Sequence, residues 1–149
     1  MNVAIVRPES WNLPLFVHVL GAMVLVGALV FAAGSLVAAR GGGSAELTRL
    51  GFRALLVGAV PAFIVMRVGA QWIESESGYD DEAAWIGLGY IASDMGLLLL
   101  IGATILAWRA VKAGGRAGGG TAARVATGLT GFLLLMYVVV IWAMTTKPD

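Results

Sequence analysis

The stretch LPLFVHVLGAMVLVGALVFAAG, residues Leu13 to Gly34, decides the fold class of this chain. Its 22 residues contain a single ionisable side chain, His18. A helix needs roughly 20 apolar residues to cross the hydrocarbon core of a bilayer, so the stretch predicts a membrane span. The apolar run is too long for the core of a signal peptide, so we expect it to be retained as a span.

The whole chain has the composition of a membrane protein. It has 149 residues, of which 59% are hydrophobic and 13% are charged, and its mean hydropathy is +0.87. Soluble domains are about 45–50% apolar and about 25% charged, so this composition excludes a water-soluble globule and a disordered chain. The net charge of +1 implies no nucleic-acid partner, and the absence of cysteine excludes disulfides and thiolate metal sites.

Three more apolar stretches follow the first. The four predicted spans cover about residues 12–39, 52–73, 85–108 and 125–145, all in one domain, 1–149. The connectors are short and polar, and the first, from Arg40 to Arg49, is predicted to be a glycine-rich turn. Pro61 lies inside the second span and is expected to kink it. The fold class predicted is all-α, an integral membrane antiparallel four-helix transmembrane bundle.

The charges of the connectors predict the direction of the spans. Lysine and arginine stay on the cytoplasmic side of a membrane. The first and third connectors with their flanks contain seven basic residues: Arg40, Arg49, Arg53, Arg109, Lys112, Arg116 and Arg124. The second connector, Glu74 to Glu82, contains only acidic charges, so both termini are expected outside. The abundance of Ala, Gly and Arg is typical of a GC-rich bacterial genome, which predicts the bacterial cytoplasmic (inner) membrane.

Three ionisable residues lie deep inside the predicted spans, away from the connectors and their flanks: His18, Arg67 and Asp94. Each costs roughly 2.5–3.5 kcal/mol on insertion scales, so each needs a reason. The rise of about 1.5 Å per helical residue places all three in the outer half of the membrane. Neighbours one turn away, and a tyrosine of the fourth span at similar depth, extend the group. The candidate ligand- or cofactor-binding site is therefore one buried cluster of His18, Arg67, Gln71, Tyr90, Asp94 and Tyr137.

Two interpretations of this cluster stay open at this point. Arg67 and Asp94 form a structural ion pair that fixes which helices meet, or the pair supports a ligand, cofactor or proton site around His18. The glycines have a simpler expected role, because small residues let helices approach closely. Gly27 and Gly34, and likewise Gly89 and Gly96, are seven residues apart and predict packing seams. Gly21, one turn below His18, would leave room for a flat cofactor.

The first span carries a family resemblance. Its histidine followed by small residues, here His18, Gly21 and Gly27, resembles the first helix of the CopD-like copper-resistance membrane proteins and of the HemJ-type protoporphyrinogen oxidases. The resemblance covers this one helix, about 22 residues. It implies a small four-helix membrane bundle. In HemJ-like members it also implies haem ligation by the histidine of helix one, which makes His18 the candidate haem iron ligand.

Three functions follow from these observations. The first is a bacterial membrane protein that binds haem or another small ligand for redox or proton transfer, with Arg67 binding a propionate or another anionic group. The alternatives are a small oligomeric transporter or channel and a non-catalytic membrane subunit or assembly factor. The sequence lacks nucleotide-binding, hydrolase and zinc-protease motifs, which favours a protein that is not an enzyme. The expected partners are the lipid bilayer and either further copies of the chain or a larger membrane complex.

Overall fold

The computed structural model describes residues 9–42, 44–77, 84–114 and 120–146. All regular structure in these ranges is helical. The elements are the short turn η1 (Glu9–Trp11), α1 (Asn12–Arg40), α2 (Ala45–Arg53), η2 (Ala54–Ala59), α3 (Val60–Ser77), α4 (Ala84–Lys112) and α5 (Thr121–Thr146). Because α2, η2 and α3 follow one another without interruption, they form a single long helix.

Four helical segments are long and apolar enough to cross a membrane. Within the described residues these candidate spans are Glu9–Arg40, Ala45–Glu76, Gly89–Lys112 and Thr121–Ala143. The predictions of an all-helical chain and of four apolar helices are confirmed, and the length and hydropathy of these helices indicate a multi-pass membrane protein.

The first connector is shorter than predicted. The helix of the second span begins at Ala45, so the predicted turn over residues 40–49 is wrong beyond Ser44. The backbone of Ser44 is extended, which suits a residue that precedes a helix. Glu46 lies in the first turn and pairs with Arg49 at 3.5 Å, an i,i+3 contact on the helix surface. The polar segment AELTR, residues 45–49, therefore belongs to the helix and not to the turn.

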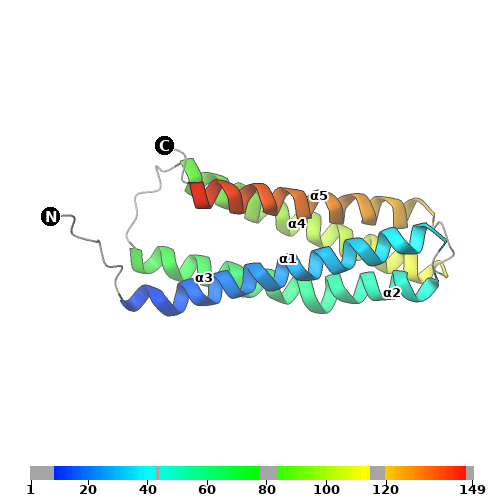
Figure 1. Cartoon of the computed structure of the whole chain (residues 1–149), viewed down its shortest axis with the longest axis horizontal. Coiled ribbons are helices and arrows are strands. Elements are labelled where there is room, and N and C mark those ends of the chain that lie inside the picture. Colours follow the sequence, from blue (N-terminus) through cyan, green and yellow to red (C-terminus); the bar gives the residue numbers. More distant parts are fainter. Residues whose placement is uncertain (1–8, 43, 78–83, 115–119, 147–149) are drawn as a thin grey trace.

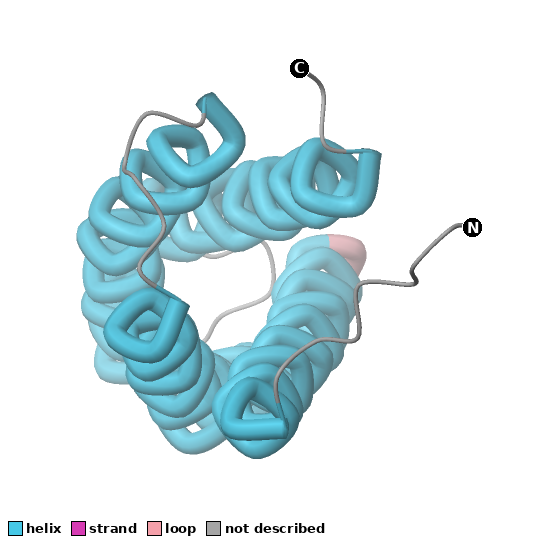
Figure 2. Tube along the Cα trace, turned by 90° about the vertical axis from the view of Figure 1, so that its left-hand side faces the viewer, coloured by secondary structure: helices cyan, strands magenta, loops and turns pink. Residues whose placement is uncertain are grey.

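Consecutive long helices run in opposite directions (Figure 1). Seen along their axes, they lie around a ring in the order α1, α3, α4, α5 (Figure 2). The closest associations are α1 with α3 and α4 with α5. We call the end at which α1 begins and α5 ends the termini end. The ribbons of the two pairs lie further apart at this end than at the opposite one (Figure 1).

Small residues fix the register of α1 against the second long helix. Cβ positions built on Gly51, Gly58 and Gly69 would meet Leu36, Ala28 and His18, respectively. The contacts advance along one helix as they recede along the other, which is the pattern of an antiparallel pair. At the termini end the approach is between backbones: a Cβ on Gly69 would lie 2.5 Å from the backbone nitrogen of His18. Glycine is required there because any side chain would separate the helices.

The second long helix accommodates Pro61 by a wide turn. Proline has no backbone N–H and cannot complete the α-helical hydrogen-bond pattern. The preceding segment η2 is a π-helix, in which the N–H of Val60 bonds the carbonyl of Leu55, five residues earlier. Such π turns are a recognised cause of helix deformation, and this one lets the helix continue past the proline.

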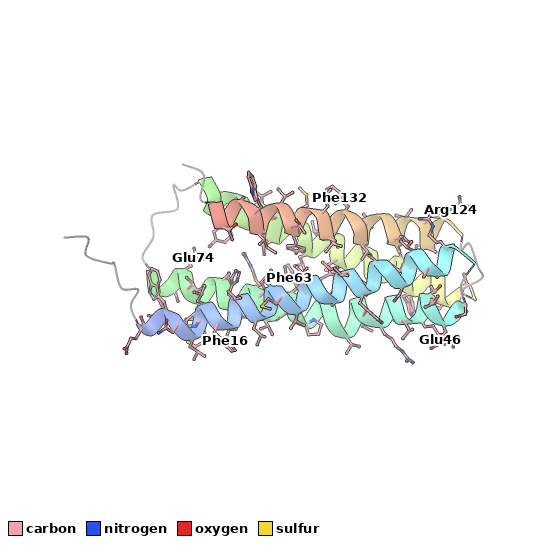
Figure 3. All side chains as sticks on the ribbon, in the orientation of Figure 1. Phe16, Glu46, Phe63, Glu74, Arg124 and Phe132 are labelled. Atoms are coloured by element: carbon pink, nitrogen blue, oxygen red, sulfur yellow. The ribbon has the colours of Figure 1, made fainter. Side chains whose placement is uncertain are left out.

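The core lies between the two helix pairs. Leu25, Leu29, Leu55 and Leu133 are at most 1% exposed. Phe63 points between the pairs, whereas Phe16 and Phe132 project away from the bundle (Figure 3). Large apolar side chains cover the outer surface of every long helix, as expected where lipid replaces water.

The predicted packing seam at Gly27 and Gly34 is wrong. Both glycines are exposed, and a Cβ added to either would have no neighbour within 4 Å. A seven-residue spacing identifies residues on one face of a helix, but it does not say whether that face meets a helix or lipid. The seam of α1 lies on the other side, at Gly21.

Candidate functional site

His18 is held by a backbone carbonyl of the neighbouring helix. The close approach of α1 and α3 brings its Nδ1 to 2.9 Å from the carbonyl oxygen of Met66. A carbonyl only accepts hydrogen bonds, so Nδ1 carries the hydrogen and donates it. In the neutral imidazole, Nε2 is then the unprotonated nitrogen with a lone pair. No hydrogen bond from the described residues reaches Nε2, and the side chain is half-buried.

This arrangement prepares His18 to act as a ligand or as a base. A histidine that ligates a metal almost always donates its other ring N–H to a carbonyl or carboxylate, which fixes the ring and its tautomer. Within the described residues, no group of three or more His, Asp or Glu side chains could hold a bare metal ion. A single imidazole suits haem, because the porphyrin supplies four ligands of its own and the protein supplies only axial ones.

Arg67, Tyr90 and Asp94 form a second cluster, between α3 and α4. The Arg67 Nη2 lies 3.6 Å from Oδ1 of Asp94. The Arg67 Cζ lies 5.1 Å from the centre of the Tyr90 ring, a distance at which the cation and the aromatic face attract each other. Because Tyr90 and Asp94 are one turn apart on α4, a single guanidinium reaches both. The ion pair predicted from the sequence is therefore present and connects α3 to α4.

The cluster lies at the surface of the bundle. The side chain of Asp94 is 76% exposed and that of Arg67 is 26% exposed. Gln71, one turn beyond Arg67, is also exposed. The prediction of one buried cluster is therefore wrong for Asp94 and Gln71. Neighbouring helical residues differ by about 100° in direction, so Ser93 is buried while Asp94 faces outward.

Tyr137 belongs to a third place, the contact between α5 and α4. Its hydroxyl lies against Gly96, which has no side chain in the way. Tyr137 is 5% exposed and Ser93, one turn before Gly96, is 7% exposed. In the described part of the chain neither hydroxyl has a hydrogen-bond partner. The buried hydroxyls of Thr104, Thr127 and Thr130 differ, because each donates to the carbonyl four residues earlier.

Removing the Tyr137 hydroxyl is expected not to destabilise the protein. A buried polar group without a partner costs about 1–3 kcal/mol, so Tyr137→Phe should leave the free energy of unfolding unchanged or raise it by about 1 kcal/mol. Thr130→Val is the matched control, because it removes a buried hydroxyl that is hydrogen-bonded, and it should be less favourable. Unfolding in mixed detergent, followed by circular dichroism, measures both. A loss of stability in Tyr137→Phe larger than in Thr130→Val would contradict the packing described here.

Two contributors to the His18 environment cannot be recognised in the sequence. The acceptor for His18 is a main-chain carbonyl, that of Met66, which no side-chain pattern identifies. Gly69 permits the approach, but its pairing with His18 depends on the register of two helices. Gly21 lies against the backbone of Met66, with 2.5 Å between its Cβ position and the Met66 nitrogen, so the expected room for a flat cofactor at Gly21 is absent.

No family model, no curated protein and no solved structure matches this chain. The fold and the site define the class as a helical multi-pass membrane protein with polar groups placed within its spans.

Proposed function

We propose that this protein binds haem in the bacterial cytoplasmic membrane, with His18 as the axial ligand of the iron. The observation that carries the proposal is the hydrogen bond from Nδ1 of His18 to the carbonyl of Met66. This bond fixes the orientation of the imidazole ring through Nδ1 and leaves Nε2 as the nitrogen with the lone pair. The partial exposure of His18 supports an accessible ligand rather than a sealed core histidine.

The neighbouring residues have supporting roles in this proposal. Arg67 follows Met66 on α3 and is the cation of the described spans that best suits a propionate or another anionic group. Tyr90 and Asp94 hold its guanidinium from α4. Bound haem would supply one-electron exchange. The same Nε2, without haem, is a base that accepts a proton within the span.

The haem proposal is tested by absorption spectroscopy of the full chain, purified in mild detergent and titrated with haemin. We expect a Soret band that shifts on reduction with dithionite in the wild type and in the control Leu135→Ala, whose side chain is exposed on α5. The variant His18→Ala should show only the spectrum of free haemin in detergent. A wild type that takes up no haem, or an unchanged band in His18→Ala, would contradict the proposal.

We further propose that the termini end faces outward. Six basic residues support this: Arg40, Arg49, Arg53, Arg109, Lys112 and Arg124 all lie towards the opposite ends of their helices. Because the chain has no cysteine, single cysteines can report the side directly. We expect a membrane-impermeant maleimide to label Ser75→Cys in intact cells, and Ser44→Cys only after lysis. The reverse pattern would contradict the orientation.

A further inference from the structure

The outer surface of α4 carries an exposed stripe at heptad-like spacing. Its members are Ile91, Asp94, Leu98, Ile101 and Ile105. They are 62%, 76%, 71%, 45% and 46% exposed, respectively. Residues spaced three and four apart form one seam along a helix, the geometry by which helices pack in pairs. Lipid can cover the apolar members of this stripe, but it cannot satisfy a carboxylate.

Asp94 lies at a depth where water and headgroups do not substitute for a protein partner. It is ten residues beyond Ala84, or about 15 Å along the axis at 1.5 Å per residue. The 29 residues of α4 span about 44 Å, against a hydrocarbon core of about 30 Å. With α4 centred in the bilayer, Asp94 would lie about 8 Å inside that core. Charged side chains at such depth almost always face a bundle interior or pair with another group.

Arg67 satisfies Asp94 from one side only. Its contact at 3.6 Å leaves 76% of the Asp94 side chain uncovered, and Arg67 itself keeps 26% of its surface exposed. The guanidinium has five donors in a planar fork, so it can serve more than one carboxylate oxygen. Arg67 on α3 and Asp94 on α4 are therefore neighbours at the surface, and both side chains are incompletely covered.

We propose that this face, made of Arg67, Asp94, Leu98 and Ile101, docks a second copy of the same chain about a two-fold axis along the membrane normal. Such an axis keeps depth unchanged and brings the same patch of both copies together. A patch with adjacent cation and anion is complementary to itself under this rotation, because each Arg67 meets the Asp94 of the other copy. The four charges sum to zero, and the apolar stripe residues complete the contact.

A different membrane protein fits this patch less well than a second copy does. A partner helix with a lone cation would leave a net positive charge inside the membrane, and one with a lone anion would leave a net negative charge. Both cases are costly in hydrocarbon. Polar contacts between helices that lie within lipid also favour association, which suits an exposed carboxylate beside a guanidinium. This interface does not require haem. In the haem proposal a propionate would share the guanidinium of Arg67, whose five donors can serve more than one carboxylate oxygen.

Cysteine cross-linking in proteoliposomes at low protein density tests the interface. The chain has no native cysteine, so Leu98→Cys and the control Leu135→Cys, which is 63% exposed on α5, each provide a single thiol. With a short bismaleimide we expect the cross-linked dimer to be the major product for Leu98→Cys and a minor product for Leu135→Cys. Equal yields at the two positions would overturn the proposal, as would cross-linking of Leu98→Cys only to another protein in native membranes.

The role of the charges is tested separately by native mass spectrometry from lipid nanodiscs. The wild type should be released as a dimer, and Asp94→Leu should shift it towards the monomer. The charge-swapped pair, Arg67→Asp with Asp94→Arg, should restore the dimer, because the exchange keeps each copy complementary to the other. A monomeric wild type, or an Asp94→Leu variant that dimerises as well as the wild type, would overturn the proposal. If Asp94→Leu does not fold, the comparison of Leu98→Cys with Leu135→Cys still decides it.

Discussion

Gly69→Ala is expected to destabilise the protein by about 1–3 kcal/mol, and Gly69→Leu by more, because overpacking a tight contact forces backbone shifts. A Cβ at this position would lie 2.5 Å from the backbone nitrogen of His18 and 2.8 Å from its Cα. These are main-chain atoms of a helix, so they cannot turn aside as the end of a flexible side chain does. The free energy of unfolding in mixed detergent, followed by circular dichroism, measures the loss.

The matched control for this prediction lies on α1. A Cβ added at Gly27 meets nothing within 4 Å, and the backbone there is ordinary helix. Gly27→Ala should therefore leave stability unchanged or raise it by up to about 1 kcal/mol, since alanine is the better helix former. If Gly27→Ala were as destabilising as Gly69→Ala, the register of α1 against α3 would be wrong. A displaced α3 would also move the Met66 carbonyl, so Gly69→Ala should weaken haem uptake.

Separating Arg67 from Asp94 is the second change with a large expected effect. Either Arg67→Leu or Asp94→Leu leaves one charge within the span without its partner, at a cost of up to about 3 kcal/mol. The double variant removes both charges and should recover most of that loss, which a double-mutant cycle measures as a coupling energy. Steric trapping in bilayer-like bicelles gives the required free energies of unfolding.

A different outcome of this cycle would change the interpretation of the pair. Single losses that simply add in the double variant would mean that Arg67 and Asp94 do not stabilise each other, despite the 3.6 Å between them.

The loss of Tyr90 provides an intermediate case. Tyr90→Leu keeps the ion pair and removes the aromatic ring beside the guanidinium. It should lower the free energy of unfolding by about 1 kcal/mol, which is less than the loss in either charge variant.

The four helices were predictable because hydropathy and length act over about 20 residues at once. The start of the second helix was not, because AELTR is polar and its helical state depends on continuity with the apolar residues that follow. Pro61 was expected to kink its helix. The structure shows that the π-helical turn of η2 accommodates the proline. No single residue of that turn predicts a π-helix from the sequence.

The sequence predicts how deep the candidate site residues lie along their helices, but not towards which side of each helix they point. Counting 1.5 Å per residue places His18, Arg67 and Asp94 in the same half of the bundle. Tyr90 and Asp94 are one turn apart on α4, and both contact Arg67 in the structure. The sequence does not say which side of each helix meets protein, so Asp94 and Gln71 appeared buried and are exposed. That direction depends on the register of the helix pairs, which Gly69 and Gly96 set through contacts far apart in the chain.

The hydrogen bond between His18 and Met66 shows the same limit. The histidine was an evident candidate, because it is the single histidine of the chain and lies within an apolar span. Its tautomer follows only from the acceptor, a main-chain oxygen of another helix at 2.9 Å. The availability of Nε2, on which the proposed function depends, is therefore a property of the folded bundle.

The most direct test of haem ligation by His18 is replacement of the side chain by free imidazole. In His18→Gly, titrated with haemin in mild detergent, we expect no Soret band typical of imidazole-ligated haem. Added imidazole should restore the band in haem that stays with the protein on gel filtration, because it supplies the missing nitrogen in the space that the side chain leaves. A His18→Gly variant that binds haem with the wild-type spectrum before imidazole is added would contradict the account, and so would a wild type that never binds it.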